Sequence, residues 1–155
     1  MKKLYLGCDH AGFELKEVIR RYLVELGQPF QDLGCDSAEV SVNYPDYAQK
    51  VVRAMLAEPG SRGILICGTG LGMSMAANRF AGIRAALCQE LYTARMSRLH
   101  NDANLLVMGG RIVGSGLARE IVRVWLTTPF EGGRHQDRLN LIDPGTFPGG
   151  KTLLG

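Results

Sequence analysis

The sequence predicts an α/β fold: a Rossmann-like, three-layer αβα arrangement in which helices cover both faces of a five-stranded parallel sheet. Short apolar runs alternate along the chain with longer segments of helical periodicity, as in successive strand–helix units. Most short runs are apolar throughout, which is typical of strands covered on both faces. The length of 155 residues, with 46% hydrophobic and 21% charged residues, fits one globular domain.

The same periodicity predicts where the elements lie. Strands are expected at Leu4–Cys8, Phe30–Leu33, Gly63–Cys67, Ile83–Leu87 and Leu105–Met108. Helices are expected at Phe13–Leu26, Tyr47–Leu56, Ser74–Arg79, Leu91–Leu99 and Leu117–Leu126. The first helix is followed by Gly27, a residue that commonly ends helices. We expect a single domain over residues 1–143 and a Pro- and Gly-rich tail over residues 144–155.

Charge and composition narrow the classes of function. The net charge of +3, without a dense Lys/Arg run, predicts no nucleic-acid partner. No apolar run is long enough to span a bilayer, and the first ten residues lack a signal-peptide core, so we predict no membrane partner. The four cysteines are scattered without a C-x-x-C pair, which favours reduced thiols in a cytoplasmic protein.

The stretch Ile64–Asn78, ILICGTGLGMSMAAN, excludes several known loops. Met73 occupies the place of the third glycine in a dinucleotide-binding G-x-G-x-x-G, and the Gly-Lys-Ser/Thr end of a Walker loop is missing. No arginine or lysine occurs in the ten residues after Cys67, as a cysteine phosphatase would need. Ser74 lies too far beyond the strand end for a hydrolase nucleophile.

The glycines of this stretch have two interpretations. They can turn successive N–H groups inward to form a cup for a phosphate or a developing oxyanion. They fit a tight, closely packed strand-to-helix turn equally well. Cys67 and Thr69, which stand beside these glycines, favour the functional interpretation, although a cysteine at a strand end is usually a packing residue.

Further polar residues follow predicted strands or helices. Ligands of parallel sheets bind beyond the carboxyl ends of the strands, and Asp9 and His10 directly follow the first strand. Such a pair, taken alone, is more often a turn or a helix cap. His100 and Asn101 follow a predicted helix, where a favourable interaction of His with the helix end is the simpler explanation.

Three arginines suggest a phosphate clamp. Arg134 and Arg138 stand four residues apart, so on a helix they would share a face, and Arg111 follows the last strand. Each arginine taken alone is better explained as a solvated side chain. Cys8 and His10 are close in sequence, but no second cluster at ligand spacing accompanies them, so no metal site is predicted.

Five ordered segments together resemble the type B ribose-5-phosphate isomerases, within the wider ribose/galactose-6-phosphate isomerase family. The segments are GCDHAGFELK (Gly7–Lys16), NYPDYA (Asn43–Ala48), ICGTGLGMSMAANR (Ile64–Arg79), RLHNDANLLVMGGRIVG (Arg98–Gly114) and FEGGRHQDR (Phe130–Arg138). The resemblance implies an aldose–ketose isomerase that interconverts ribose 5-phosphate and ribulose 5-phosphate through a cis-enediolate, without a metal or organic cofactor. Allose 6-phosphate or galactose 6-phosphate is the alternative substrate.

The resemblance also implies a role for each matching residue. Cys67 is expected to be the base that removes the C2 proton, and Thr69 to move protons between the substrate oxygens. His100, assisted by Asp9, is expected to open the furanose ring. The remaining substrate contacts are expected from the loop N–H groups of Gly68, Gly70, Leu71, Gly72, Met73 and Ser74, from the phosphate ligands His10, Arg111, Arg134 and Arg138, and from Tyr44 and Asn101.

Two positions place the chain within that family. Some members use a glutamate where this chain has Met73, so it resembles the cysteine branch. Asn43 stands where an aspartate is usual, which is expected to weaken a hydrogen bond near Tyr44.

The family's site lies between two subunits, which implies a homodimer, with pairing into a tetramer left open. A nucleotide-binding module without catalysis is a third hypothesis, but it leaves His100 and the arginines without a role.

Overall fold

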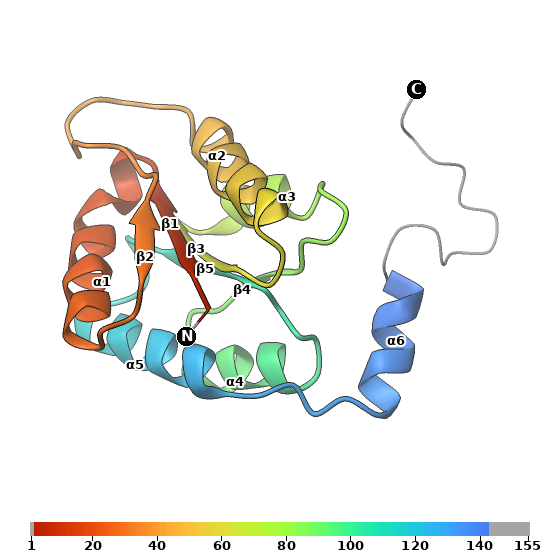
Figure 1. Ribbon diagram of the computed structural model, residues 1–155. Helices are drawn as coiled ribbons and strands as arrows, with labels where there is room; N and C mark the ends of the chain where they lie inside the picture. The colour runs from red at the N-terminus through yellow and green to blue at the C-terminus, as the bar shows by residue number, and fades with distance from the viewer. Residues whose placement is uncertain (1, 143–155) are drawn as a thin grey trace, which may run out of the picture.

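The described part of the chain, residues 2–142 of a computed structural model, folds as three layers (Figure 1). The middle layer is a sheet of five strands in the order β2-β1-β3-β5-β4. The strands are β1 (Leu4–Cys8), β2 (Phe30–Asp32), β3 (Arg62–Cys67), β4 (Ala85–Leu87) and β5 (Leu105–Gly109). All neighbouring strands are parallel, so the predicted α/β fold is confirmed.

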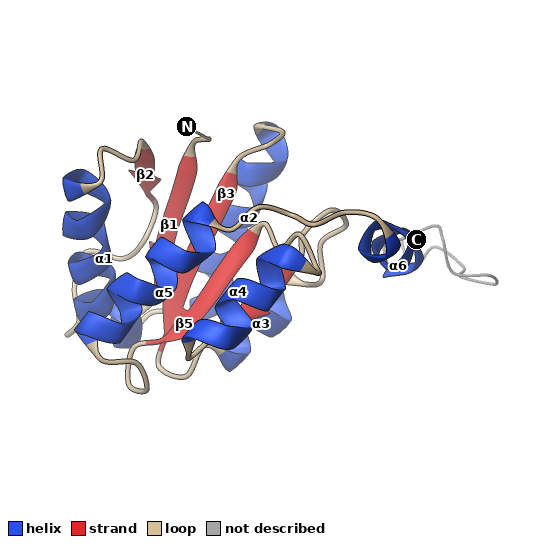
Figure 2. Cartoon of the chain, turned by 90° about the horizontal axis from the view of Figure 1, so that it is seen from below, coloured by secondary structure: helices blue, strands red, loops and turns tan. Residues whose placement is uncertain are grey.

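Helices cover both faces of this sheet (Figure 2). One face carries α1 (Phe13–Glu25), α4 (Leu91–Leu99) and α5 (Ser115–Thr127), and the other carries α2 (Tyr44–Ala57) and α3 (Leu71–Ala77). A 3-10 helix, η1 (His10–Gly12), connects β1 to α1. The last helix, α6 (Arg134–Ile142), lies apart from these layers. No helix in residues 2–142 combines the length and apolar character needed to cross a bilayer.

Each face of the sheet has its own apolar core, because successive strand side chains point to opposite faces. Leu6, Ile64 and Ile66 are fully buried against the α1, α4 and α5 layer, together with Trp125. Leu65, Cys67, Leu105 and Val107 are buried on the other face with Met73 of α3. This double burial explains why the strand runs are apolar throughout.

Several predicted boundaries were wrong. α2 begins at Tyr44 rather than Tyr47, because Pro45 fits the first turn of a helix and starts it earlier. α3 begins at Leu71 rather than Ser74, directly after the glycine turn. The strand β4 excludes Ile83, whose N–H donates to the carbonyl of Phe80 in a turn.

α6 was not predicted as a separate element. Only His135 and Leu139 of this helix are buried, so it lacks the apolar stripe that identifies a helix from sequence. Its presence does place Arg134 and Arg138 four residues apart on one helix. The predicted tail, residues 144–155, lies outside the described residues.

Candidate active site

The connections that follow β1, β3 and β5 lie side by side at the carboxyl edge of the sheet. The register pairs Cys8 with Ile66 and Cys67 with Gly109, so these strands end at one level. The N–H of Gly110 donates to the carbonyl of Cys67 at 2.7 Å, and the N–H of Arg111 donates to the carbonyl of Gly68 at 3.0 Å. The edge therefore brings together Asp9, the Cys67 loop and Arg111.

Cys67 ends β3 with its sulfur under the glycine loop, and its side chain is buried. The backbone N–H of Gly70 donates to Cys67 Sγ at 3.2 Å. Gly70 has φ +81°, and a β-carbon there would lie 2.4 Å from Leu87 Cδ1, so glycine is required. The loop therefore directs a backbone N–H at the sulfur, and the thiolate is the nucleophilic and basic form of cysteine.

The rest of the loop is also held by its own hydrogen bonds. The N–H of Leu71 donates to Thr69 Oγ1 at 3.3 Å, and the N–H of Ser74 donates to the carbonyl of Gly70 at 3.0 Å within α3. Ser74 N–H therefore has an acceptor inside the helix. The N–H groups of Gly72 and Met73, in the first turn of α3, have no acceptor four residues earlier by helix geometry.

Tyr44 covers this loop from α2. A β-carbon on Gly72 would lie 2.5 Å from Cζ and 2.9 Å from Oη of the Tyr44 ring, so the ring lies directly against the loop backbone. Asn43, the residue before α2, makes no side-chain hydrogen bond to cap the helix. Tyr44 is thus placed by packing on Gly72, where only glycine leaves room for the ring.

Asp9 and His10 follow β1 at the same edge. Asp9 is buried, and its Oδ1 accepts a hydrogen bond from the N–H of Gly12 at 3.0 Å, so it caps η1. The N–H of Val42 donates to His10 Nδ1 at 3.2 Å. Nδ1 of His10 is thus used as an acceptor, which leaves Nε2 as the ring nitrogen that can contact a ligand.

Arg111 and Gln89 complete the carboxyl edge. Arg111 is exposed, and its guanidinium lies against the backbone of Gly68, with Nη1 3.3 Å from the place a β-carbon would take. Gln89 was missed by the sequence reasoning. Its Nε2 donates to the carbonyl of Thr69 at 2.9 Å, and its Oε1 accepts from the N–H of Gly109 at 3.0 Å. The sequence feature that could have identified Gln89 is its position just after β4, at the carboxyl edge of the sheet.

The other predicted residues lie at the opposite, amino edge of the sheet. His100 and Asn101 follow α4, which runs from the carboxyl edge back to the amino edge. The turn after them leads into β5, and there the N–H of Gly63, near the start of β3, donates to the carbonyl of Asn104 at 2.9 Å. Cys67 lies four positions farther along β3 than Gly63, about 13 Å of strand. The predicted clamp of Arg111 with Arg134 and Arg138 does not form within one chain, because α6 also follows a helix that ends at the amino edge.

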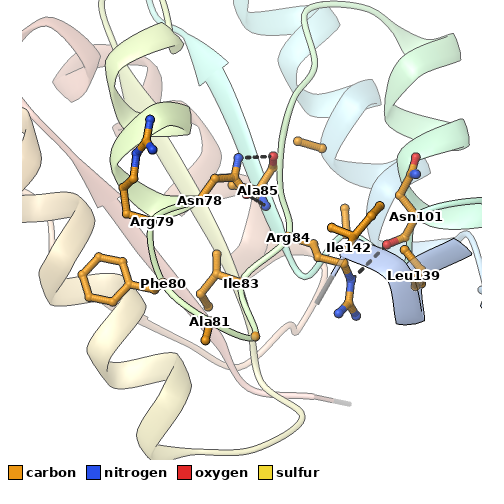
Figure 3. A pocket seen from close by; sticks show the side chains of 13 residues that line it. Asn78, Arg79, Phe80, Ala81, Ile83, Arg84, Ala85, Asn101, Leu139 and Ile142 are labelled. Carbon is orange, nitrogen blue, oxygen red and sulfur yellow. Dashed lines mark hydrogen bonds between the residues drawn. The ribbon is translucent and has the colours of Figure 1, made fainter. Parts of the chain in front are cut away.

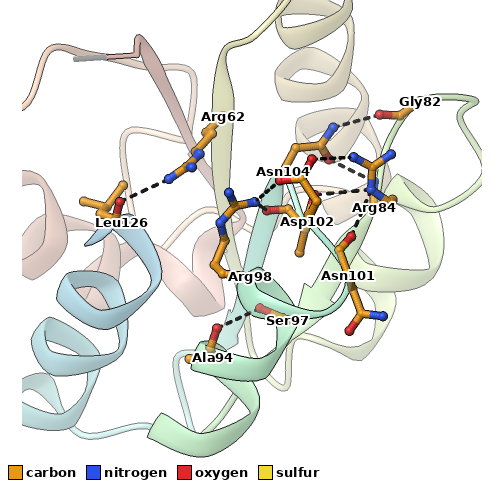
Figure 4. Close-up of polar contacts among 11 residues, drawn as sticks. Arg62, Gly82, Arg84, Ala94, Ser97, Arg98, Asn101, Asp102, Asn104 and Leu126 are labelled. Carbon is orange, nitrogen blue, oxygen red and sulfur yellow. Dashed lines mark hydrogen bonds and ion pairs between the residues drawn. The ribbon is translucent and has the colours of Figure 1, made fainter. Parts of the chain in front are cut away.

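The turn after His100 is held by ion pairs and hydrogen bonds (Figure 4). Arg98 Nη1 lies 2.8 Å from Asp102 Oδ1, and Arg84 Nη2 lies 3.1 Å from Asp102 Oδ2. Arg84 Nε also donates to the carbonyl of Asn101 at 3.1 Å. Asp102 adopts φ 42°, a conformation these contacts support. They fix the backbone that presents His100 and Asn101.

His100 stacks on His135, a second residue that the sequence reasoning missed. The ring centroids are 4.2 Å apart and the planes differ by 12°. Glu131 Oε2 lies 3.9 Å from His100 Nε2 and 3.7 Å from His135 Nε2. Burial, together with the nearby His100, lowers the pKa of His135 below its ordinary value. The sequence alone gave no reason to select His135, because its contact with His100 joins residues that are far apart in the sequence.

A pocket of about 440 Å³ lies between the loop before β4 and α6 (Figure 3). Phe80, Ile83 and Arg84 line it from the loop, and Leu139 and Ile142 line it from α6. Cys67 is not among its lining residues. This pocket is therefore separate from the carboxyl-edge cluster.

A sequence model described as Ribose/Galactose Isomerase matches residues 4–142. The chain belongs to this family. It is 52% identical over 142 residues to ribose-5-phosphate isomerase B of Escherichia coli, which covers 92% of this chain and 95% of that protein. The structure of this family member is similar to the crystal structure of a ribose 5-phosphate isomerase of Thermotoga maritima. The two sequences are 54% identical, and the TM-score is 0.88 over 92% of this chain and 97% of the other.

Ribose-5-phosphate isomerase B of Clostridium thermocellum is also similar, with 50% identity and a TM-score of 0.87 over 90% of this chain and 94% of that one. These matches cover nearly the whole of each protein. The resemblance to type B ribose-5-phosphate isomerases is therefore confirmed, and these structures share the αβα fold predicted from the sequence pattern.

Proposed function

We propose that this chain interconverts ribose 5-phosphate and ribulose 5-phosphate. Relatives with about half of their residues identical, over almost their full length, are named for this reaction. The names of these relatives do not favour the six-carbon alternative. Within the chain, the observation that carries the proposal is the hydrogen bond from Gly70 N–H to Cys67 Sγ, because it combines a buried thiol with an inward-facing amide.

The reaction requires a base and a site for negative charge. As a thiolate, Cys67 takes the proton from C2 while the carbonyl oxygen at C1 gains charge as the enediolate forms. The loop N–H groups then lie where they can stabilise that oxygen. The Cys67 thiol returns the proton to C1, and Thr69 moves a proton between the two oxygens. Because base and oxyanion donors suffice for this transfer, the proposed reaction uses no metal or organic cofactor.

The two edges of the sheet support a site shared between two copies of the chain. Cys67, Thr69, His10 and Arg111 lie at the carboxyl edge, whereas His100, Asn101, Arg134 and Arg138 lie at the amino edge. A sugar phosphate is too short to span the length of a strand. We infer a homodimer in which the amino edge of one copy faces the carboxyl edge of the other, so that His100 opens the ring beside the second copy's Cys67.

Arg134 and Arg138 fit this arrangement. Both are exposed on α6, and this helix lies apart from the three layers in Figure 1. With Arg111 and His10 of the other copy they would surround a phosphate with hydrogen-bond donors, of which the three arginines are charged. A cytoplasmic location, expected from the cysteines, stays a prediction.

The test is an isomerase assay on the full chain with ribose 5-phosphate. We expect conversion by the intact protein and a loss of kcat of at least about 10³-fold in Cys67→Ala, since a base contributes on this scale. Cys88→Ala is the matched control, because Cys88 is also buried but lies in the core and is expected to keep the rate. An inactive intact protein would contradict the function, and full activity of Cys67→Ala would contradict the base.

A further inference from the structure

Two cysteine sulfurs that the proposed reaction does not use lie in contact behind the carboxyl edge. Cys8 Sγ and Cys35 Sγ are 3.7 Å apart, and both side chains are buried in the core on the α1 face of the sheet. Cys67 is buried in the core of the opposite face, so the sheet separates this pair from the proposed base. All four cysteines of the chain are free thiols. The pair is therefore a second thiol site, distinct from Cys67.

The backbone around the pair has the spacing that a disulfide requires. The N–H of Cys35 donates to the carbonyl of Cys8 at 3.2 Å, which continues the parallel pairing of β2 with β1. Backbones paired in this way lie about 4.8 Å apart, within the Cα separation of about 4.4–6.8 Å that disulfides bridge. Gly34 leaves space for the Cys8 sulfur, because a β-carbon there would lie 3.0 Å from it. Closing the bond requires the sulfurs to approach from 3.7 Å to about 2.05 Å.

Cys35 also anchors the connection between β2 and α2, residues 33–43, which we call the strap (Figure 1). Lys16 Nζ donates to the carbonyl of Cys35 at 3.2 Å and so holds the root of the strap against α1. Near the other end of the strap, the N–H of Val42 donates to His10 Nδ1 at 3.2 Å. The strap therefore links the cysteine pair to a residue that is proposed to contact the phosphate of the substrate.

The two thiols differ in how they can react. Burial, together with the nearby Cys35, raises the pKa of the Cys8 thiol, and the charge of Lys16 opposes this rise. Cys8 is 0% exposed, whereas Cys35 is 4% exposed and its Sγ donates to the carbonyl of Ser37 in the strap at 3.3 Å. A small oxidant therefore reaches the Cys35 sulfur first, and Cys8 supplies the second sulfur of the bond.

We propose that Cys8 and Cys35 form a reversible disulfide when the protein meets hydrogen peroxide, and that this bond weakens the binding of the phosphorylated substrate. The Cys35 thiolate attacks one peroxide oxygen, which breaks the O–O bond, leaves a sulfenic acid and releases hydroxide that takes up the proton lost by Cys35. The Cys8 sulfur then attacks the Cys35 sulfur, and the sulfenic oxygen leaves as water with the Cys8 proton. The two thiols lose two electrons, and the peroxide gains them and becomes two waters.

The effect on binding rests on the proposed function, in which His10 contacts the phosphate. β1 is paired on both sides, with β2 and with β3, so Cys8 is the fixed partner and Cys35 supplies the movement. This movement draws the root of the strap toward β1 and is passed through Val42 to His10. Cytoplasmic disulfides are usually transient and serve as sensors, so a bond that reductant reopens fits the predicted location.

Peptide mapping tests the bond without reference to activity. Reduced full-length protein is treated with hydrogen peroxide, its remaining thiols are blocked with N-ethylmaleimide in denaturant, and trypsin cuts the chain. The four cysteines fall in four different tryptic peptides, with Cys8 in residues 4–16 and Cys35 in residues 22–50. We expect these two peptides to be linked, at least tenfold more often than any other two different cysteines, and dithiothreitol to separate them.

Cys88→Ala is the matched control, because Cys88 is also buried and its removal should leave the link unchanged. Oxidation of Cys35 to a sulfinic acid without the link to Cys8, or a link that mainly joins another pair, would overturn the site. The intact protein alone decides this outcome, so it does not depend on whether a cysteine variant folds.

The effect on binding is measured in Cys67→Ala, where the proposed base cannot be oxidised and the substrate is not consumed. Calorimetric titration with ribose 5-phosphate should give an affinity at least threefold lower after peroxide treatment, and dithiothreitol should restore it. Adding Cys35→Ala, or Cys8→Ala, should make the affinity insensitive to peroxide. An unchanged affinity in protein that carries the link would overturn the effect on binding. A link in a protein that neither binds nor isomerises ribose 5-phosphate would keep the disulfide and overturn the proposed function alone.

Discussion

The backbone N–H of Gly70 lies 3.2 Å from the sulfur of Cys67 and donates a hydrogen bond to it. This bond joins the proposed base to the loop that faces the substrate. Gly70 itself has a positive φ, which lets the chain turn into α3 directly after this N–H and which glycine adopts most readily. The geometry of one glycine thus sets the surroundings of the thiol.

Replacing Gly70 with alanine should therefore reduce both stability and activity. The added β-carbon would lie 2.4 Å from Leu87 Cδ1 and 3.0 Å from the backbone of Met108, in a conformation unfavourable for alanine. We expect a loss of about 1–3 kcal/mol in urea unfolding and a clear fall in kcat. Gly116→Ala in α5 is the control, since nothing lies within 4 Å of its β-carbon. Equal stability of Gly70→Ala and Gly116→Ala would refute this explanation.

Gly72 and Tyr44 should be energetically coupled. Gly72→Ala displaces the Tyr44 ring, and we expect kcat/KM to fall about tenfold, while Tyr44→Ala removes the clash. The cost of Gly72→Ala should then be much smaller in the Tyr44→Ala background, with a coupling energy of roughly 1 kcal/mol. A double-mutant cycle on kcat/KM measures it. Strictly additive effects would mean that the two residues act independently.

Gln89 should hold the loop rather than take part in chemistry. Gln89→Ala removes the bonds to Thr69 O and Gly109 N–H, and we expect a loss of about 1–3 kcal/mol in stability and a reduced kcat. Gln89→Glu keeps the acceptor for Gly109 but loses the donor to Thr69, so it separates the two bonds. Wild-type stability and kcat in Gln89→Ala would show that the loop needs neither.

Lys16 should stabilise the α1–β2 contact in a pH-dependent way. Its Nζ is buried 2.8 Å from Asp32 Oδ2 and donates to the carbonyl of Cys35 at 3.2 Å. Burial alone lowers the pKa of Lys16, but the hydrogen bond and charge of Asp32 outweigh it and raise the pKa. The pair's contribution is therefore full below about pH 10.4 and lost as the pH rises through the folded pKa.

Lys16→Met checks this prediction by unfolding across pH. The variant should be less stable than the intact protein by about 1–3 kcal/mol at pH 7, and the difference should narrow above about pH 10.4. Arg123→Met is the control, because Arg123 pairs with Glu120 on the surface, where an ion pair contributes little. A difference that widens at high pH would contradict the assigned cause.

The sequence predicted the sheet well because its strands are buried on both faces and read as plain apolar runs, such as Leu4–Cys8 and Gly63–Cys67. It predicted the Cys67 loop because glycines and a strand end are local features. α6 was missed because it buries only His135 and Leu139. Gln89 and His135 were missed because their roles depend on neighbours distant in sequence, Thr69 and His100 respectively. The separation of the site into two edges follows from topology, which no local pattern contains.

That separation is the central claim, and mixing two inactive variants tests it most directly. Cys67→Ala and His100→Ala proteins are each assayed alone with ribose 5-phosphate, then unfolded together, refolded at equal concentration and assayed again. If each site takes Cys67 from one copy and His100 from the other, random pairing leaves about a quarter of all sites intact, and activity should return to that level. A mixture that stays as inactive as its two parents, while gel filtration shows mixed dimers, would contradict the shared site.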